Sequence, residues 1–166
     1  MTEARSPLVV REPTREELRD VAKLAAALVR LHHTWDAARF FVMEPIEAGY
    51  ERFLASQLGD ARTVILAALL EGRVVGYTYA RFEDRDWNLL LDAHGAIHDV
   101  YVDADARRTG VAKQLVLETI ARLEAMGAQR VVLSTARKNE AGQRLFAALG
   151  FRETMIEMTR ERSSAP

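Results

Sequence analysis

The chain has 166 residues, with 23 Lys plus Arg against 24 Asp plus Glu and no cysteine. This length fits one domain over residues 1–166, with flexible tails at about 1–7 and 161–166. A net charge of -1 lacks the basic footprint of nucleic-acid-binding proteins, and no apolar stretch reaches the roughly 20 residues that span a bilayer. The lack of cysteine excludes disulfides and zinc-thiolate sites. We therefore expect a soluble, cytoplasmic protein without a nucleic-acid or membrane partner.

The N-terminal part predicts a short strand followed by an amphipathic helix. Residues 8–10 are a β-favouring run, and Thr14 with Glu17 matches the pattern of a helix capping box. Apolar residues then recur at steps of three and four, which gives the helix one buried face. This helix should end near His32 or His33.

The next segments predict a variable region and then a hairpin. Residues 35–45 are aromatic and irregular, and the weaker helical spacing of residues 46–58 fits either a second helix or a mobile flap. Residues 63–70 and 73–82 are β-rich and are separated by a short polar turn. We expect two adjacent antiparallel strands there.

The second half of the chain alternates strands and helices after a polar loop over residues 83–92. The expected elements are a strand over 95–102, a helix over 110–126, a strand over 131–134, a helix over 139–149 and a closing strand over 154–159. This order predicts a mixed α/β architecture, with one sheet and helices on both of its faces.

The junction before the 110–126 helix has the features of an anion site. A strand that passes through a short loop into a helix aims unpaired backbone N–H groups at one point, where the helix dipole also favours negative charge. Gly110 permits close approach of the backbone, and Arg107 and Arg108 add charge. A pyrophosphate would fit this loop. On these residues alone, an ordinary helix start is the alternative.

Two motifs resemble the GNAT superfamily of acyl-CoA-dependent N-acyltransferases. Arg107, Gly110 and Ala112 match the three fixed positions of that family's phosphate loop, and the segment from Asn139 to Phe151 is similar to its second cofactor-binding segment. The resemblance implies the GNAT fold: a central, mixed and mostly antiparallel sheet with helices on both faces and a splayed pair of parallel strands. It also implies acetyl-CoA or another acyl-CoA as the acyl donor.

The resemblance further implies how the donor binds. Backbone groups of Val100, Tyr101 and Val102 would pair with the pantetheine arm, the loop from Arg107 to Ala112 would cradle the pyrophosphate, and Asn139 would contact the donor from the opposite side. The expected binding residues are Val100, Tyr101, Val102, Arg107, Arg108, Thr109, Gly110, Val111, Ala112, Asn139 and Phe146.

Acetyl transfer to an amine needs a neutral nucleophile and therefore a proton acceptor. His98 lies on the predicted strand, and an imidazole can serve as a base at neutral pH. In the family, polyamine and arylalkylamine acetyltransferases place a Glu or a His at the corresponding position. A buried histidine that makes one hydrogen bond is the alternative. Asp99 is the second candidate base, because it faces the other side of a regular strand unless a bulge reverses the two.

Phe146 departs from the family pattern. Many members carry a tyrosine there, thought to protonate the leaving thiolate, and phenylalanine has no proton to give. Water, Tyr77, Tyr79 or Tyr101 could replace it, although each tyrosine also suits packing within a strand. A catalytically silent CoA-binding sensor or interaction module is therefore the alternative to an N-acetyltransferase.

The acceptor is expected to be the primary amine of a small molecule or peptide. The aromatic residues that could line its pocket are Trp35, Phe40, Phe41 and Trp87. The acids that could attract a cation are Glu83, Asp84 and Asp86. Ordinary core aromatics and a solvated acidic loop are the alternative.

Neighbouring histidines and the C-terminal segment support two further expectations. His32 and His33 project about 100° apart on a helix and cannot share a metal ion, so we predict no metal site. The β-rich segment over 154–159, together with the frequent dimers of the family that the sequence resembles, predicts a possible homodimer.

Overall fold

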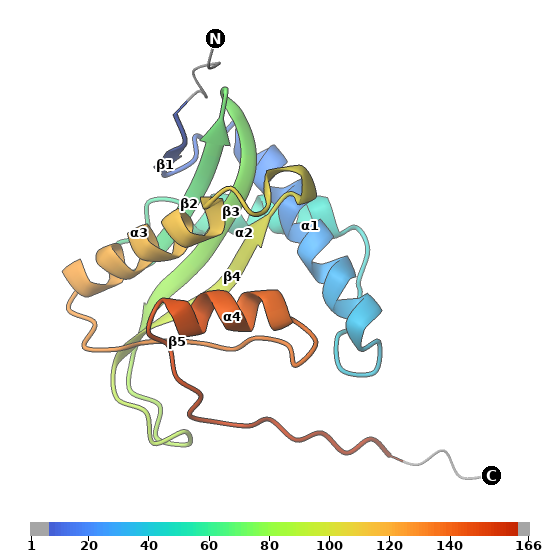
Figure 1. Cartoon of the computed structure of the whole chain (residues 1–166), viewed down its shortest axis with the longest axis vertical. Coiled ribbons are helices and arrows are strands. Elements are labelled where there is room, and N and C mark those ends of the chain that lie inside the picture. Colours follow the sequence, from blue (N-terminus) through green and yellow to red (C-terminus); the bar gives the residue numbers. More distant parts are fainter. Residues whose placement is uncertain (1–6, 163–166) are drawn as a thin grey trace.

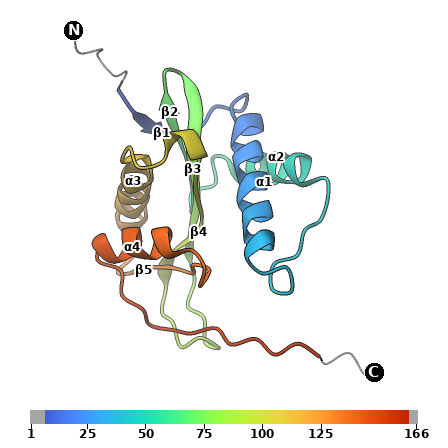
Figure 2. The ribbon, with the colours of Figure 1, turned by 45° about the vertical axis from the view of Figure 1, so that its right-hand side comes forward.

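The computed structural model describes residues 7–162 and places a twisted sheet between two layers of helices (Figures 1 and 2). The elements in chain order are β1 (Val9–Arg11), α1 (Leu18–Trp35), α2 (Ile46–Gln57), β2 (Thr63–Leu70), β3 (Arg73–Glu83), β4 (His94–Val102), a short 3₁₀ turn (Ala104–Ala106), α3 (Val111–Ala125), β5 (Val131–Leu133) and α4 (Glu140–Ala148). The tails expected to be flexible lie almost wholly outside the described residues. None of the helices within residues 7–162 combines the length and apolar character needed to cross a membrane.

The sheet has five strands in the order β1-β2-β3-β4-β5. Neighbouring strands are antiparallel, except that β4 and β5 run parallel. The parallel pairing covers only Gly95–Ile97 of β4 against β5. The mixed, mostly antiparallel sheet predicted from the sequence is therefore confirmed, including its parallel pair.

Helices cover both faces of the sheet. Seen nearly edge-on in Figure 2, α1 and α2 lie on one side, and α3 and α4 lie on the other. Alternate residues of β2 point to opposite sides, so Leu66 packs under α3 whereas Ile65 packs under α1. Strands buried on both faces are apolar along nearly their whole length, which explains the continuous apolar run in β2.

Local signals in the N-terminal half form as predicted. The backbone N–H of Thr14 donates to Glu17 Oε2 at 2.8 Å, and the N–H of Glu17 donates to Thr14 Oγ1 at 3.3 Å, which completes the capping box. The turn between β2 and β3 has positive φ at Glu71 and Gly72, 51° and 76°, as a two-residue hairpin requires. Helix α1 extends past the predicted end to Trp35, and the segment with weaker helical spacing forms α2.

The predicted closing strand over residues 154–159 is wrong. The chain from Arg152 to Arg162 is exposed and belongs to no strand. β-favouring side chains stabilise a strand only through neighbours to which it can pair, and this segment lies beside none of the five strands (Figure 1).

Gly95 sets how closely α3 approaches β4, and we predict that Gly95→Ala destabilises the protein. A Cβ there would lie 2.8 Å from Cδ1 and 3.0 Å from Cβ of Leu123. Overpacking of this kind costs about 1–3 kcal/mol. Urea unfolding should show the loss. Gly49→Ala is the control, because its Cβ meets nothing within 4 Å inside α2, and it should be neutral or stabilising by up to about 1 kcal/mol. Equal effects of the two changes would contradict the close approach.

Candidate active site

Strand β4 separates from β5 partway along its length. Its last residue paired with β5 is Ile97, which lies opposite Leu133, where β5 ends. Asp103 N–H donates to Val75 of β3 at 2.8 Å, so by alternation Val100 and Val102 direct their backbone groups to the side that β5 has left. This splay agrees with the sequence expectation. Of the three residues expected to offer backbone groups there, Tyr101 directs its own groups toward β3.

A β-bulge occurs where β4 begins to separate from β5. Asp99 pairs with Tyr79 and Ile97 pairs with Ala80, which leaves His98 as the extra residue. Ile97 packs in the core under α3, whereas Asp99 reaches Tyr77 in the core under α1 and α2. In a regular strand these two positions would share a face. The bulge therefore brings Asp99 to the same face as Tyr77, which a regular strand would not do.

Asp99 is partly buried among phenols. The hydroxyl of Tyr77, which is fully buried, donates to Asp99 Oδ2 at 3.0 Å. Burial raises the pKa of the Asp99 carboxyl, while the Tyr77 hydrogen bond and the charges of His98 and His32 oppose that rise. Burial also raises the pKa of Tyr50 to about 12. The phenols of Tyr50 and Tyr77 therefore stay protonated at neutral pH, and that of Tyr77 serves as a hydrogen-bond donor to Asp99.

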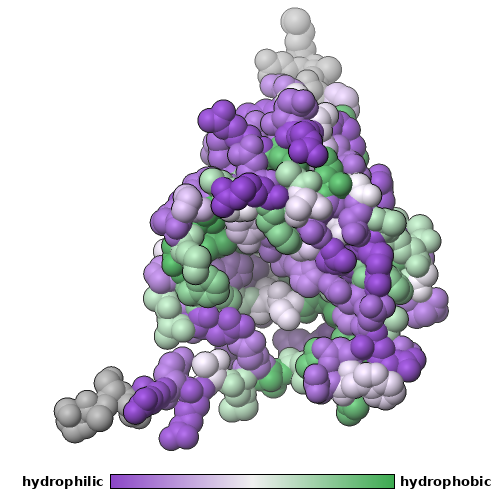
Figure 3. All heavy atoms as spheres, turned by 180° about the vertical axis from the view of Figure 1, so that it is seen from behind, coloured by the Kyte–Doolittle hydropathy of each residue, from purple (hydrophilic) through white to green (hydrophobic). Residues whose placement is uncertain are grey.

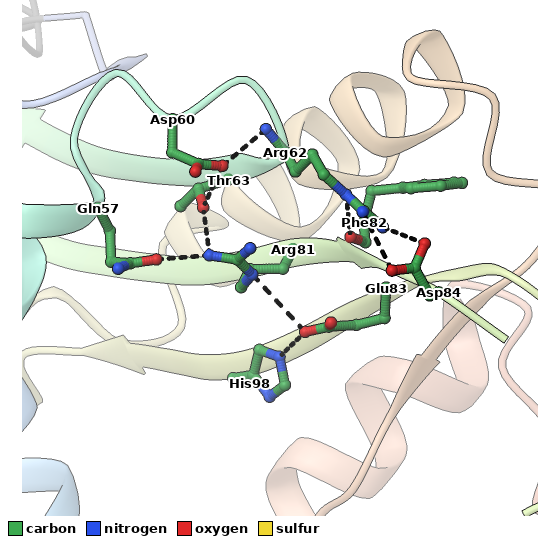
Figure 4. A network of polar contacts seen from close by, with 9 residues as sticks. All are labelled: Gln57, Asp60, Arg62, Thr63, Arg81, Phe82, Glu83, Asp84 and His98. Atoms are coloured by element: carbon green, nitrogen blue, oxygen red, sulfur yellow. Dashed lines mark hydrogen bonds and ion pairs between the residues drawn. The ribbon is translucent and has the colours of Figure 1, made fainter. Parts of the chain in front are cut away.

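The side chain of His98 lies on the same face of the sheet as that of Asp99 but is more exposed. Its ring stacks on Tyr79, with centroids 5.5 Å apart and planes 29° from parallel. Its Nε2 lies 3.2 Å from Glu83 Oε1, and Glu83 also lies 3.8 Å from Nε of Arg81 (Figure 4). The bulge thus places both candidate bases next to each other, with His98 exposed and Asp99 partly buried. The alternative of a buried structural histidine does not fit the exposed His98.

The phosphate loop ends at the N-terminus of α3. Gly110 precedes this helix with φ of 89°, and no side chain caps the helix. The first backbone N–H groups of a helix have no partner within it, and a Cβ on Gly110 would meet nothing within 4 Å, so the space beside this helix start is unfilled. Thr109 Oγ1 donates to the carbonyl of Ala106 at 2.6 Å and holds the loop. A phosphate group fits this position by charge and by space.

The two arginines of the loop behave differently. The Nε of Arg107 donates to the carbonyl of Val102 at 3.0 Å, and its guanidinium lies 5.4 Å from the centre of the Tyr101 ring. Arg107 therefore fastens the loop to the end of β4. Arg108 is exposed, with a positive φ of 60°, and its side chain stands in solvent at the helix N-terminus.

The second motif forms the start of α4. The Oδ1 of Asn139 accepts from Gly142 N–H at 3.1 Å and caps the helix, and its Nδ2 donates to Thr135. The ring of Phe146 packs edge-on against Phe151, with centroids 5.9 Å apart. Asn139 has protein partners for both of its side-chain polar atoms, so its first role is to shape the motif.

The three acids predicted to attract a cation have different partners in the structure. Asp84 is paired with Arg62 at 2.9 Å, and Asp86 accepts backbone N–H groups of its own loop. Only Glu83 points to His98 (Figure 4). The expectation that all three could attract a cation therefore narrows to Glu83.

The four aromatic residues predicted to line the acceptor pocket do not gather in one place. Trp35 and Phe40 pack edge-on against His32, with centroids 5.1 Å and 4.8 Å away. By contrast, Phe41 is 76% exposed and Trp87 is 74% exposed. These two residues line no pocket with the others in the described structure.

The two neighbouring histidines bond to separate carbonyls. Nδ1 of His32 lies 2.9 Å from the Leu28 carbonyl, and Nδ1 of His33 lies 2.7 Å from that of Phe40. Within residues 7–162, no group of three or more His, Cys, Asp or Glu side chains is arranged to hold a metal ion.

Sequence reasoning missed three residues around the site. Tyr50 and Phe53 come from α2, and Phe53 packs against Tyr79 with centroids 5.2 Å apart. Lys138 Nζ donates to the carbonyl of Trp35 at 2.7 Å and joins the second motif to the end of α1. Only the weak helical spacing of α2 pointed to the two aromatics, and nothing in the sequence pointed to the Lys138 contact.

We predict that Tyr77→Phe raises the pKa of the Asp99 carboxyl further, because the carboxylate loses a hydrogen-bond donor. Carbon-13 NMR titration of the Asp99 carboxyl measures this shift. Tyr101→Phe is the control, since the Tyr101 hydroxyl bonds to Arg107 instead, and it should leave the titration nearly unchanged. A lowered pKa of the Asp99 carboxyl in Tyr77→Phe would contradict the contact between Tyr77 and Asp99.

The raised pKa of the Asp99 carboxyl also makes the stability of the folded protein depend on pH. The folded protein holds the Asp99 proton more tightly than the unfolded chain does. The resulting stabilisation is present below the unfolded pKa of the carboxyl and is lost as the pH rises through the folded value. Asp99→Asn should abolish this component in urea unfolding measured across acid pH.

The sequence pattern of the Acetyltransferase (GNAT) family matches residues 29–151. An uncharacterized N-acetyltransferase of Mycobacterium tuberculosis (strain ATCC 25618 / H37Rv) is 35% identical over 99 residues, which make up 59% of this chain and 58% of the relative. The chain thus matches less than two thirds of that relative's length.

Solved structures share the fold at low identity. A tetramutant of the BH1408 protein from Bacillus halodurans has a TM-score of 0.79 at 21% identity, covering 93% of this chain and 99% of that chain. The aminoglycoside N-acetyltransferase AAC(6')-Iy, in complex with CoA, has a TM-score of 0.78 at 19% identity, covering 98% and 100%. Because the family pattern runs from α1 to the residue Phe151 beyond α4, this chain belongs to the acetyltransferase (GNAT) family.

Proposed function

We propose that this protein is an acyl-CoA-dependent N-acyltransferase that moves an acetyl group from acetyl-CoA to a primary amine of a small molecule or peptide. The observation that carries the proposal is the position of the bulge. His98 and Asp99 follow directly after Ile97, the last residue of β4 paired with β5. Two candidate proton acceptors therefore stand where an open strand edge begins, and that edge leads to the uncapped N-terminus of α3.

This arrangement supports a binding mode for the donor. The backbone groups of Val100 and Val102 would pair with the amide groups of pantetheine as an added strand would. The loop from Arg107 to Ala112 would hold the pyrophosphate at the helix N-terminus. Asn139 and Phe146 would border the donor from α4.

The reaction is a direct transfer within a ternary complex. The neutral amine nitrogen attacks the thioester carbonyl, a C–N bond forms, the C–S bond breaks and CoA leaves as a thiolate. His98 accepts the proton that the amine gives up, and Asp99 is the second candidate for this role. Phe146 has no hydroxyl, so the proton that the thiolate takes up comes from water or from one of the tyrosines Tyr77, Tyr79 and Tyr101.

Glu83 favours a cationic acceptor. It is the one acid of its loop that faces His98, and a carboxylate there raises the local concentration of an ammonium substrate. Polyamines and aminoglycosides carry such charge, and a similar fold occurs in AAC(6')-Iy, which is named as an aminoglycoside N-acetyltransferase. A thiol-release assay with polyamines, arylalkylamines, amino acids, aminoglycosides and peptides tests the acceptor class directly.

One observation favours a second candidate function. Phe146 has no hydroxyl and its ring packs against Phe151, so this position of α4 gives no proton to a leaving thiolate, as expected of a catalytically silent CoA-binding module. Calorimetric titration and thiol release separate the two. Binding of acetyl-CoA with turnover of any amine supports the enzyme, whereas binding without turnover across the panel supports the silent module. No binding near millimolar acetyl-CoA would remove both.

We predict that His98→Gln lowers kcat by about 10² to 10⁴, the usual contribution of a positioned acid–base group. Affinity for CoA should change little, because His98 lies at the far end of the open edge from α3. In the wild type, log(kcat/KM) should rise with pH through the neutral range, and this limb should vanish in the variant. An unchanged pH profile would eliminate His98 and shift the role to Asp99, which Asp99→Asn then tests in the same assay.

We predict that Gly110→Ala weakens CoA binding by about tenfold or more, equivalent to about 1.4 kcal/mol, because a methyl group would occupy the space offered to the phosphate. Gly127→Ala is the matched control. Both glycines have positive φ, 89° and 100°, and a Cβ on either would meet nothing within 4 Å. Both variants should lose similar stability from backbone strain, but only Gly110→Ala should raise the Kd in calorimetry. Equal Kd values would argue against the phosphate loop.

A further inference from the structure

Strand β3 places three polar side chains in a row on the face of the sheet that α1 and α2 cover. Tyr79, Arg81 and Glu83 occupy every second position of the strand, so their side chains share this face. The ring of His98 stacks on Tyr79, and its Nε2 lies 3.2 Å from Glu83 Oε1. Arg81 stands between these two contacts, and its charge therefore lies close to the candidate base.

The guanidinium of Arg81 reaches toward α2 and β2 (Figure 4). Its Nη1 donates to Gln57 Oε1 of α2 at 2.5 Å and to Thr63 Oγ1 of β2 at 3.1 Å, and both acceptors are neutral. Its Nε lies 3.8 Å from Glu83 Oε1, which is longer than a hydrogen bond. A guanidinium and a carboxylate frequently form two parallel hydrogen bonds. The two neutral acceptors hold Arg81 short of that pairing.

Glu83 is therefore shared unequally between its two neighbours. Its Oε1 is closer to the His98 ring than to Arg81, and a carboxylate beside an imidazole favours the protonated ring by charge and by hydrogen bonding. Full pairing with Arg81 would neutralise the carboxylate and weaken this support. The position in which Arg81 is held thus determines how much of the Glu83 charge acts on His98.

Water reaches this network, which limits the size of the effect. The side chains of Arg81, Glu83 and His98 are 27%, 36% and 45% exposed, and charges in such a setting are partly screened. Figure 3 shows the face opposite to that of Figure 1, where hydrophilic side chains border a hollow in the surface. The other titratable groups near His98 are Tyr79 and Asp99, and then His32 of α1 and Tyr50 of α2, which interact with Asp99.

We propose that Gln57 and Arg81 are positioning residues that set how readily His98 takes up a proton. They act through Glu83, because Gln57 draws the guanidinium toward α2 and leaves the carboxylate to the imidazole. Helix α2 thereby takes part in the acid–base chemistry without contact to the reacting atoms. This inference rests on the proposed function, in which His98 accepts the proton of the amine.

Two substitutions of Gln57 should change the proton uptake of His98 in opposite directions. Gln57→Ala frees Arg81 to pair with Glu83, so the ring should take up its proton at a lower pH. Gln57→Glu adds a carboxylate that holds and neutralises the guanidinium, so the ring should take up its proton at a higher pH. Each shift should be about 0.2–0.7 of a pH unit, as for partly exposed ion pairs. NMR titration of the His98 ring protons in the protein without CoA measures both.

Two further variants separate this relay from a change in net charge. Arg52→Gln lowers the net charge by one, as Gln57→Glu does, at an exposed position of the same helix, and should shift the titration less. In a Glu83→Gln background, Gln57→Ala should cause no further shift, because the carboxylate that transmits the effect is gone. The proposal is overturned by absent shifts, by shifts of one sign for both Gln57 variants, by an equal shift in Arg52→Gln, or by an undiminished effect without Glu83.

The pH profile of turnover gives a second readout. The limb of log(kcat/KM) that rises with pH should move to lower pH in Gln57→Ala and to higher pH in Gln57→Glu, in step with the NMR titration. Shifts in the NMR titration without turnover of any amine would support the positioning of His98 and remove the proposed activity. Turnover with an unmoved NMR titration would overturn the positioning alone. Both variants should keep the circular dichroism of the wild type, because the Gln57 side chain is only partly buried.

Discussion

A strand inside a sheet needs hydrogen-bonding partners along both edges, and beyond Ile97 β4 has a strand partner along only one. The rest of the site is arranged around this constraint. The bulge lies where the partner is lost, and the loop that follows β4 turns the chain into α3 so that unpaired N–H groups of the helix stand at the end of the open edge. Backbone groups, which any sequence possesses, thus define most of the proposed donor site.

The side chains on the face of the sheet that α1 covers add ionisable groups, which the backbone lacks. Tyr77 and Asp99 form a polar pair within an otherwise apolar cluster, and such a pair is tolerated because each group satisfies the other. Nearer to solvent, Arg81 is tied to α2 through Gln57, and Glu83 lies between Arg81 and His98 (Figure 4). The candidate site therefore has a partly buried carboxyl and an exposed imidazole next to each other at one bulge.

The sequence predicted most of the fold because its signals are local. The capping box at Thr14 and Glu17, the turn at Gly72 and the positive-φ Gly110 each act within a few residues. The strand–loop–helix junction before α3 was predicted for the same reason. The bulge at His98 was not predictable, because it depends on the register between β3 and β4. Likewise, only tertiary contacts reveal that Asp84 is neutralised by Arg62.

In the C-terminal segment, by contrast, a local signal predicted a strand that does not form. Residues 154–159 have a strand's composition, and propensity alone cannot state where a partner lies. The half-buried stripe of α4 was equally invisible, since its spacing reads as that of any amphipathic helix. Both the wrongly predicted strand and the half-buried stripe lie in the part of the chain that follows β5, the strand at one edge of the sheet.

The contact between Glu83 and His98 selects a tautomer. An ionised carboxylate only accepts hydrogen bonds, so the Nε2 that faces Glu83 carries the hydrogen in the neutral ring. The free lone pair is then on Nδ1. The imidazole rests flat on Tyr79, which keeps both nitrogens at the ring's accessible rim. An amine that loses its proton to this ring must therefore approach from the side away from Glu83, and the carboxylate that attracts the cation is not the group that it touches as it reacts.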